Sequence, residues 1–216
     1  LSPQVQAMLG LEQADINGHD LVRAVLKMPV DLLWNGGIGT YVRATQESDA
    51  SVFDSSNDSV RISASELWAR VVGEGGNGGF TQLARIEYAS AGGRINTDAI
   101  DNSAGVDMSD HEVNIKMLLQ GLPAGEMTPE ARNQALESMT AEVTRAVLKD
   151  NYWQSLSLSM SQRRWREDVS LLSSLTQELA IHGLLDPVIE NLPDRKALQA
   201  RHREGAGLTR PELAIL

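Results

Sequence analysis

The 216-residue sequence predicts an α/β fold in which an open sheet is followed by an all-helical segment. Before residue 120, short apolar segments alternate with helical patterns and glycine turns, which is typical of an open α/β sheet. After that point the apolar residues recur at helical spacing. Most of the 18 glycines lie in the first part. The segment Gly121-Leu122-Pro123-Ala124-Gly125 therefore marks the expected boundary between a domain over 1–120 and a helical region over 121–216.

The first 120 residues predict three short strands, each followed closely by glycine or polar residues: 30–34, 69–72 and 94–96. A helix is expected over 19–28, where Pro29 ends the apolar pattern. A second is expected over 81–91, because Gly92 and Gly93 follow it. Two further segments predict a polar loop and a helical turn, over 48–59 and 65–68.

The last 96 residues predict helices with regular apolar faces. Thr128 caps the first, and Pro129 suits its first position. Its apolar face comprises Leu136, Met139, Val143 and Val147. A further helix is expected to carry Trp165, Val169, Leu172, Leu175 and Leu179 on one face. A shorter polar helix is expected over 194–204.

Composition excludes several classes of protein. With 19 basic and 29 acidic residues, the formal charge is −10, which disfavours binding to nucleic acid or to an anionic membrane. No apolar run reaches the roughly 20 residues of a membrane span. Cysteine is absent, so disulfides and thiolate metal sites are excluded. Because the chain starts at Leu1 and ends in a helix opened by Thr209, we expect a fragment of a longer protein.

A glycine pattern follows the second expected strand. Gly73-Glu74-Gly75-Gly76-Asn77-Gly78 matches G-x-G-x-x-G, a loop that can bring backbone N–H groups to a pyrophosphate. Asp98 lies 20 residues beyond Gly78, where a ribose-binding acid is sought. Only half of the required βαβ context is visible, so a strand-end turn with another role is the favoured interpretation.

A second polar turn, Asn102-Ser103-Ala104-Gly105-Val106, follows the third expected strand. Ligands bind outside the carboxyl ends of strands in open α/β sheets. The Asn102 amide offers a donor and an acceptor, which suits a carboxamide such as nicotinamide. An Asx-turn that merely caps the next helix is the alternative.

Other candidate sites are weaker. Asp107 and His111 are four residues apart in a cluster at the expected start of a helix over 110–119, but the acids suit a helix start and we expect no metal site. The basic segment 163–166 is interpreted as a solvated helix face with Trp165 turned inward. No hydrolase triad or ATP-binding loop is present.

Three long segments resemble the large bacterial NAD-specific glutamate dehydrogenases. They are residues 29–41, which contain Trp34-Asn35-Gly36-Gly37; residues 71–82, which contain Glu74-Gly75-Gly76-Asn77; and residues 92–114. Residues 207–214 also resemble that family's C-terminal region. The resemblance implies the later half of a partial Rossmann-like NAD domain over 1–120 and part of a helical C-terminal region over 121–216.

The resemblance also implies a reaction and a site. The family converts L-glutamate and NAD to 2-oxoglutarate, ammonia and NADH, and cytoplasmic, homo-oligomeric enzymes are expected. By similarity, Asn77 would contact the nicotinamide ribose and Asn102 the carboxamide. Ser109 would reach the substrate's side-chain carboxylate, while Asn35 and Gly36 would border the cofactor.

The same resemblance assigns the catalytic Lys and Asp, and the diphosphate loop, to regions upstream of Leu1. The glycine pattern would then be an accidental match. Lys27 and Lys116 are interpreted as helix residues, so no catalytic residue is expected here and the isolated chain should be inactive. Two alternatives stay open: another amino-acid dehydrogenase, which Ser109 would discriminate, and a non-catalytic interaction module with a degenerate NAD fold.

Overall fold

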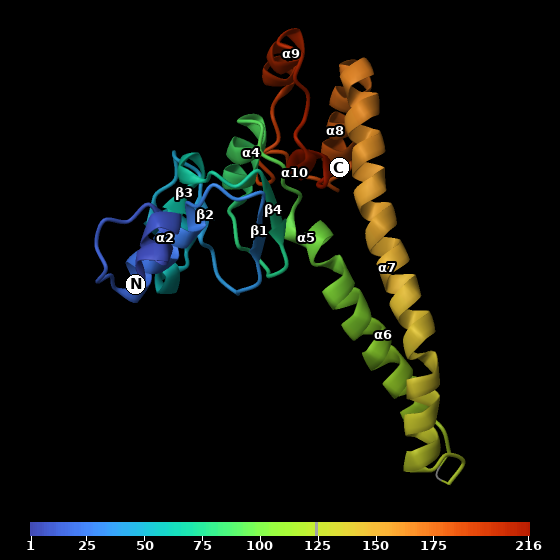
Figure 1. The fold of residues 1–216 in the computed structure, drawn as a ribbon. Helices are drawn as coiled ribbons and strands as arrows, with labels where there is room; N and C mark the ends of the chain where they lie inside the picture. The colour runs from blue at the N-terminus through green and yellow to red at the C-terminus, as the bar shows by residue number, and fades with distance from the viewer. Residues whose placement is uncertain (124) are drawn as a thin grey trace.

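The computed structural model describes residues 1–123 and 125–216, apart from the side chains of residues 166 and 167. It confirms the expected fold class: a mixed α/β part with small, open, parallel sheets is followed by a mostly helical segment (Figure 1). Ala124, in the middle of the expected domain boundary, lies outside the described residues. The rest of that segment joins two long helices.

Two parallel strand pairs form the sheets. Strands β1 (Leu32–Asn35) and β4 (Val71–Glu74) pair in register from Leu32 opposite Val71 to Asn35 opposite Glu74. The second pair joins β2 (Val42–Arg43) to β3 (Ile62–Ser63). Because β1 and β4 are parallel and end together, Asn35 and Glu74 lie side by side at one sheet edge.

The third expected strand, over 94–96, does not form. In the described part of the chain, a single isolated bridge between Val71 and Arg94 extends the β1–β4 pair. Pairing stops because Thr97 is already the N-cap of the next helix, which leaves only Ile95 and Asn96 after the bridge.

The expected helices of the first part are present as α2 (Gly18–Leu26) and α4 (Gln82–Ser90). The helical turn expected over 65–68 is η2 (Ala64–Glu66). The prediction of a loop over 48–59 was wrong, because Ser48 forms a capping box with Ser51 and starts a short helix. The remaining short helices are α1 (Pro3–Leu9), α3 (Asp49–Val52), η1 (Ser55–Asn57) and α5 (Asp98–Asp101).

The segment that contains α3 and η1 folds around the buried side chain of Arg61. This guanidinium lies 3.2 Å from an Asp49 carboxylate oxygen and 3.8 Å from one of Asp54, and it also pairs with Asp58. It donates to the Thr40 carbonyl at 2.9 Å. A buried charge needs such partners, so the polar segment is ordered by the cation that it surrounds.

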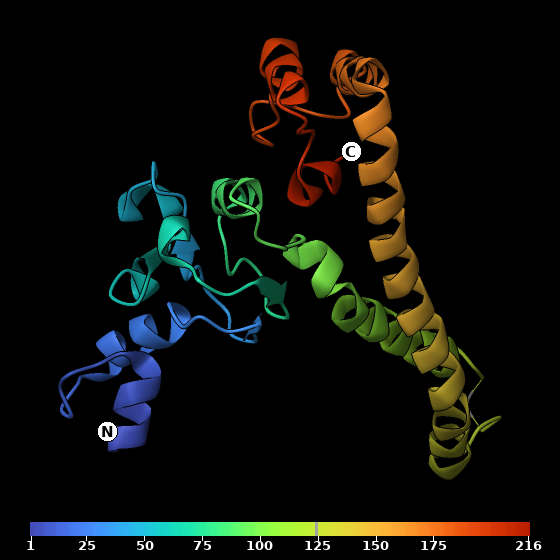
Figure 2. The same cartoon turned by 45° about the horizontal axis from the view of Figure 1, so that its top comes forward.

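Helix α6 (Ser103–Gln120) and helix α7 (Pro129–Glu167) form a long two-helix arm beside the sheets (Figures 1 and 2). Thr128 caps α7 and Pro129 takes its first turn, as predicted. Helix α6 begins earlier than the expected start at Asp110. The helices that follow are α8 (Val169–Ile181), α9 (Arg195–Arg203) and α10 (Arg210–Leu213).

The single helix expected to carry both Trp165 and Leu179 is divided at Asp168. The Asp168 carboxylate accepts the Leu171 N–H at 3.0 Å and the Ser170 hydroxyl at 2.7 Å. Asp is a strong N-cap, so it ends α7 and starts α8 although the apolar spacing continues across the break. Trp165 and Val169 still pack against the same core.

Two apolar cores lie on either side of α4. The first joins the sheets to α4 and includes Val42, Ile62, Val72, Phe80 and Tyr88. The second joins α7, α8, α9 and α10 and includes Leu158, Leu172, Leu198, Leu208 and Leu213. Helix α10 contacts α4 and α7 and so ties the helical segment to the sheet part.

Candidate functional site

A buried ion pair stands at the carboxyl edge of β1 and β4. Arg85 of α4 binds both oxygens of the Glu74 carboxylate, with Nε 2.7 Å from Oε2 and Nη2 2.9 Å from Oε1. Glu74 is fully buried and its Oε1 also accepts the Phe80 N–H at 3.2 Å. Burial raises the pKa of Glu74, and the pairing with Arg85 opposes that rise. The pair fixes the end of β4 against α4.

Two aspartates of α5 extend this network to the loop over 75–80. Asp98 lies 3.1 Å from Arg85 Nη2 and accepts the Gly78 N–H at 2.7 Å. Asp101 accepts the Glu74 N–H at 3.0 Å. The last residue of β4 and the loop that follows it are therefore each held through a backbone N–H by a carboxylate of α5.

The two asparagines that the sequence singled out meet in this structure. Asn102 Nδ2 donates to Asn77 Oδ1 at 2.6 Å, across 25 residues of chain. They line a shallow hollow of about 350 Å³ together with Asp98, Ala99, Ser103, Gly105 and Val106. In the described part of the chain, Asn77 Nδ2 and Asn102 Oδ1 have no other partner. A donor and an acceptor side by side complement a carboxamide or a ribose hydroxyl.

Asn35 and Gly36 border the same edge. The Asn35 carbonyl accepts the Gly76 N–H at 2.9 Å, and its side-chain oxygen accepts the Gly37 N–H at 3.2 Å. Gly36 is exposed, with open space around its Cα atom. Asn35 therefore joins the turn after β1 to the loop after β4.

Gly73 and Gly75 of the G-x-G-x-x-G match, and the adjacent Gly76, serve close packing, whereas Gly78 has open space at its Cβ position and a φ of 65°. A Cβ atom at Gly73 or Gly75 would lie 2.4 or 2.5 Å from the Trp34 ring, and one at Gly76 would lie 2.3 Å from the Gly37 carbonyl oxygen. The N–H groups of Gly76 and Gly78 are bonded within the chain. The arrangement fits the favoured interpretation, a strand-end turn.

Ser109 lies in the second turn of α6, not before a helix that starts at Asp110. It is exposed, and its hydroxyl donates to the Val106 carbonyl at 2.8 Å. The Ser109 hydroxyl thus has a hydrogen-bond acceptor within its own helix and can also rotate toward solvent.

The remaining candidates are paired with other side chains of the chain. His111 Nδ1 lies 3.1 Å from an Asp107 carboxylate oxygen, and no group of three or more potential metal ligands converges within the described residues. Lys27 pairs with Glu66 after the end of α2, and Lys116 pairs with Glu112 within α6. None of the described helices has the length and apolar character needed to cross a membrane.

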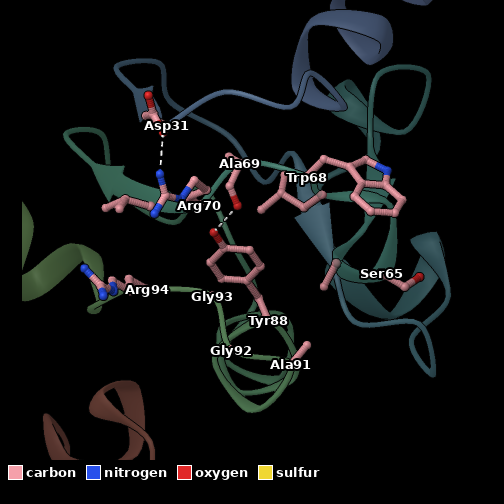
Figure 3. Close-up of a pocket in the computed structure, with 13 residues that line it drawn as sticks. Asp31, Ser65, Trp68, Ala69, Arg70, Tyr88, Ala91, Gly92, Gly93 and Arg94 are labelled. Atoms are coloured by element: carbon pink, nitrogen blue, oxygen red, sulfur yellow. Dashed lines mark hydrogen bonds and ion pairs between the residues drawn. The ribbon is translucent and has the colours of Figure 1, made fainter.

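A second cavity, of about 770 Å³, opens at the opposite, amino end of the strands (Figure 3). Tyr88 lines this cavity, and its hydroxyl donates to the Ala69 carbonyl at 2.6 Å. Arg70 and Asp31 also line it and form an ion pair at 2.9 Å. Asn77 and Asn102 do not line this cavity. This cavity is thus separate from the hollow that Asn77 and Asn102 line at the carboxyl edge of β1 and β4.

Of the residues that hold the site, sequence reasoning singled out Asp98, but as a ribose-binding acid, and missed Arg85 and Asp101. Arg85 lies on a helix that reads as an ordinary amphipathic segment, and Asp101 reads as one acid among several. Trp34 is 61% exposed, yet its ring covers two glycines. The glycines opposite Trp34 were the available signal, because such spacing often marks a close approach of another group.

The chain is similar to known proteins along its whole length. Residues 1–161 match the family described as bacterial NAD-glutamate dehydrogenase, catalytic domain. Three relatives named NAD-specific glutamate dehydrogenase align over 100% of the chain: 48% identical in Pseudomonas aeruginosa, 44% in Halomonas elongata and 47% in Mycobacterium tuberculosis. The chain spans 13%, 14% and 14% of the lengths of these relatives.

Proposed function

The chain belongs to the bacterial NAD-glutamate dehydrogenase family, and from this premise we propose that it supplies the nicotinamide side of an NAD site. The enzyme would convert L-glutamate and NAD to 2-oxoglutarate, ammonia and NADH. The hydride chemistry belongs to the cofactor, whereas this segment would orient the nicotinamide. A cytoplasmic homo-oligomer is part of the same proposal.

The hydrogen bond between Asn102 and Asn77 is the observation that supports this role most directly. It leaves Asn102 Oδ1 to accept from a carboxamide N–H and Asn77 Nδ2 to donate to a carbonyl or hydroxyl oxygen. Asn77 lies on the loop after Glu74, which Arg85 holds, and Asn102 directly follows α5, whose Asp98 also pairs with Arg85. A binding group gains affinity when its position is set before the ligand arrives.

Ser109 would set the preference for a substrate with a distal carboxylate. It lies on the helix that starts directly after Asn102, about two turns further along. A hydroxyl in this place can donate to a carboxylate oxygen, and such bonds to charged groups are the stronger ones. Another amino-acid dehydrogenase would not need this donor.

The proposal includes no catalytic acid or base in this chain. Lys27 and Lys116 are each paired with a neighbouring glutamate, and the family resemblance assigns the catalytic Lys and Asp to another region. The isolated 216-residue chain should therefore show no glutamate oxidation.

Turnover assays test this function. A full-length protein that carries this segment should form NADH and 2-oxoglutarate in equal amounts from L-glutamate and NAD. The isolated chain should form neither, against a typical turnover of about 1–1,000 per second. Preferred oxidation of an apolar amino acid would favour the other dehydrogenase class. A full-length protein without NAD affinity would favour the interaction module.

A further inference from the structure

A cavity of about 820 Å³ lies between the segment after α4 and the segment that connects α9 to α10. Its volume is that of a small-molecule site. Its charged lining residues are Arg94, Arg201, Glu204 and Arg210. Three cations and one anion thus meet in a chain whose net charge is −10. The cavity therefore has a net positive lining in an acidic chain.

Arg210 carries the argument, because its partners are neutral. Its Nε lies 2.7 Å from Asn96 Oδ1, its Nη1 lies 2.9 Å from the Ser159 hydroxyl, and its Nη2 lies 3.3 Å from the Ser155 carbonyl. Within the described residues no carboxylate lies within 4.0 Å of this guanidinium. Burial lowers the pKa of Arg210, and only the more distant Asp101 opposes that effect.

Other arginines that are buried or half-buried in this chain are neutralised directly. Arg201 lines the same cavity, but the fully buried Glu212 accepts from its Nη1 with both oxygens, at 2.8 and 2.9 Å. Arg85 has Glu74 as its counter-ion. A half-buried cation without such a partner is costly, and a bound anion would remove that cost.

Arg94 supplies a second, adaptable cation. It is exposed, and the described part of the chain offers it no carboxylate within ion-pair distance. Its backbone is fixed by hydrogen bonds to Val72 of β4 and to Arg70, and Arg94 lines both this cavity and the one at the amino end of the strands. Glu204 is the one lining group that would repel an anion.

We propose that this cavity is a binding site for a small multivalent anion with carboxylate or phosphate oxygens, held by Arg210 and Arg94. Bonds from a guanidinium to such oxygens are charge-assisted and can be bidentate. The site is distinct from the hollow at Asn77 and Asn102, so it does not depend on the proposed NAD role.

Calorimetric titration of the full-length protein that carries this segment tests the proposal, with sodium phosphate and sodium succinate as separate probes. Sodium chloride keeps the ionic strength constant. Saturable binding of either probe is expected, and the tighter of the two identifies the anion class. Arg210→Gln and Arg94→Gln should each weaken binding about 10-fold or more. Glu204→Gln should tighten it about 2- to 5-fold.

Arg70→Gln is the matched control, because Arg70 is an exposed arginine close in sequence to the same strand and pairs with Asp31. The affinity of the Arg70→Gln variant for both probes should equal that of the unsubstituted protein. If Arg210→Gln does not fold, Arg94→Gln and Glu204→Gln still decide the question. Absence of saturable binding with both probes, or equal affinity in all variants, overturns the proposal.

Discussion

Arg85 and Glu74 form a buried, two-pronged ion pair that joins α4 to the end of β4. Glu74 has no exposed surface, and the side chain of Arg85 is 9% exposed. Both charged groups therefore lose their contact with water, and their attraction in a fixed geometry offsets that loss. Its consequence is the placement of the loop that carries Asn77.

Removal of Arg85 should destabilise the protein strongly. Arg85→Met leaves the Glu74 carboxylate buried without a counter-ion, which costs about 3–5 kcal/mol. Arg70→Met is the control, since the Arg70–Asp31 pair is exposed and worth about 0–1 kcal/mol. Urea unfolding of both variants measures the difference. Similar losses for the two substitutions would mean that the buried pair has no special weight.

The segment around Arg61 predicts loss of stability in acid. Burial alone would raise the pKa of Asp49, but hydrogen bonds from Arg43 and Arg61 bring its pKa below the ordinary value. The pKa of Asp54 is also lowered, chiefly by the Thr40 N–H. For a carboxylate with a depressed folded-state pKa, the stabilisation is present above the unfolded value of about 3.9 and is lost as pH falls below it.

Urea unfolding between about pH 6 and pH 3 tests this dependence. The free energy of unfolding should fall below about pH 4, and Asp49→Asn should reduce the slope. Asp31→Asn, at an exposed ion pair, should leave the slope nearly unchanged. An unchanged slope in Asp49→Asn would show that the cluster does not contribute to acid sensitivity.

Ser109→Ala should reduce the preference for glutamate over norvaline in the full-length enzyme. The substitution removes one hydrogen bond to a charged group, worth roughly 1.5–3 kcal/mol. Norvaline lacks the distal carboxylate, so its kcat/KM should change much less. The fold should survive, because the exposed hydroxyl bonds only to the Val106 carbonyl.

Ser138→Ala provides the control for Ser109. Its hydroxyl makes the same local bond, 2.8 Å to the Ala135 carbonyl, on an exposed face of α7. Comparison of kcat/KM for the two substrates in both variants separates substrate contact from loss of a helix bond. If Ser109→Ala keeps the glutamate-to-norvaline ratio, Ser109 is an ordinary helix residue.

Local patterns predicted most elements of the fold but not how they end. The Pro29 stop, the Gly92 stop and the Thr128 cap are short-range signals, and the helices beside them are present. The break at Asp168 was missed because apolar spacing continues across it. The third strand does not form because Thr97, three residues after the bridge at Arg94, already caps α5.

The candidate site was predicted in part for the same reason. Motif resemblance selected Asn77 and Asn102, and their hydrogen bond brings them together at one sheet edge. Pairings such as Arg85 with Glu74, or Arg210 with Asn96 across 114 residues, depend on tertiary packing. No spacing rule along the chain relates such partners, so the residues that hold the site in place could not be selected from sequence.

The kinetic effect of Asn102→Ala tests the central claim most directly. In the full-length enzyme, kcat/KM for NAD should fall about 5- to 150-fold, because a lost amide leaves the nicotinamide carboxamide partly unpaired at roughly 1–3 kcal/mol. Arg164→Ala, on an exposed face of α7, should change it by no more than about 0.5 kcal/mol. Equal values of kcat/KM for NAD in the two variants would contradict the assignment of this edge to the cofactor.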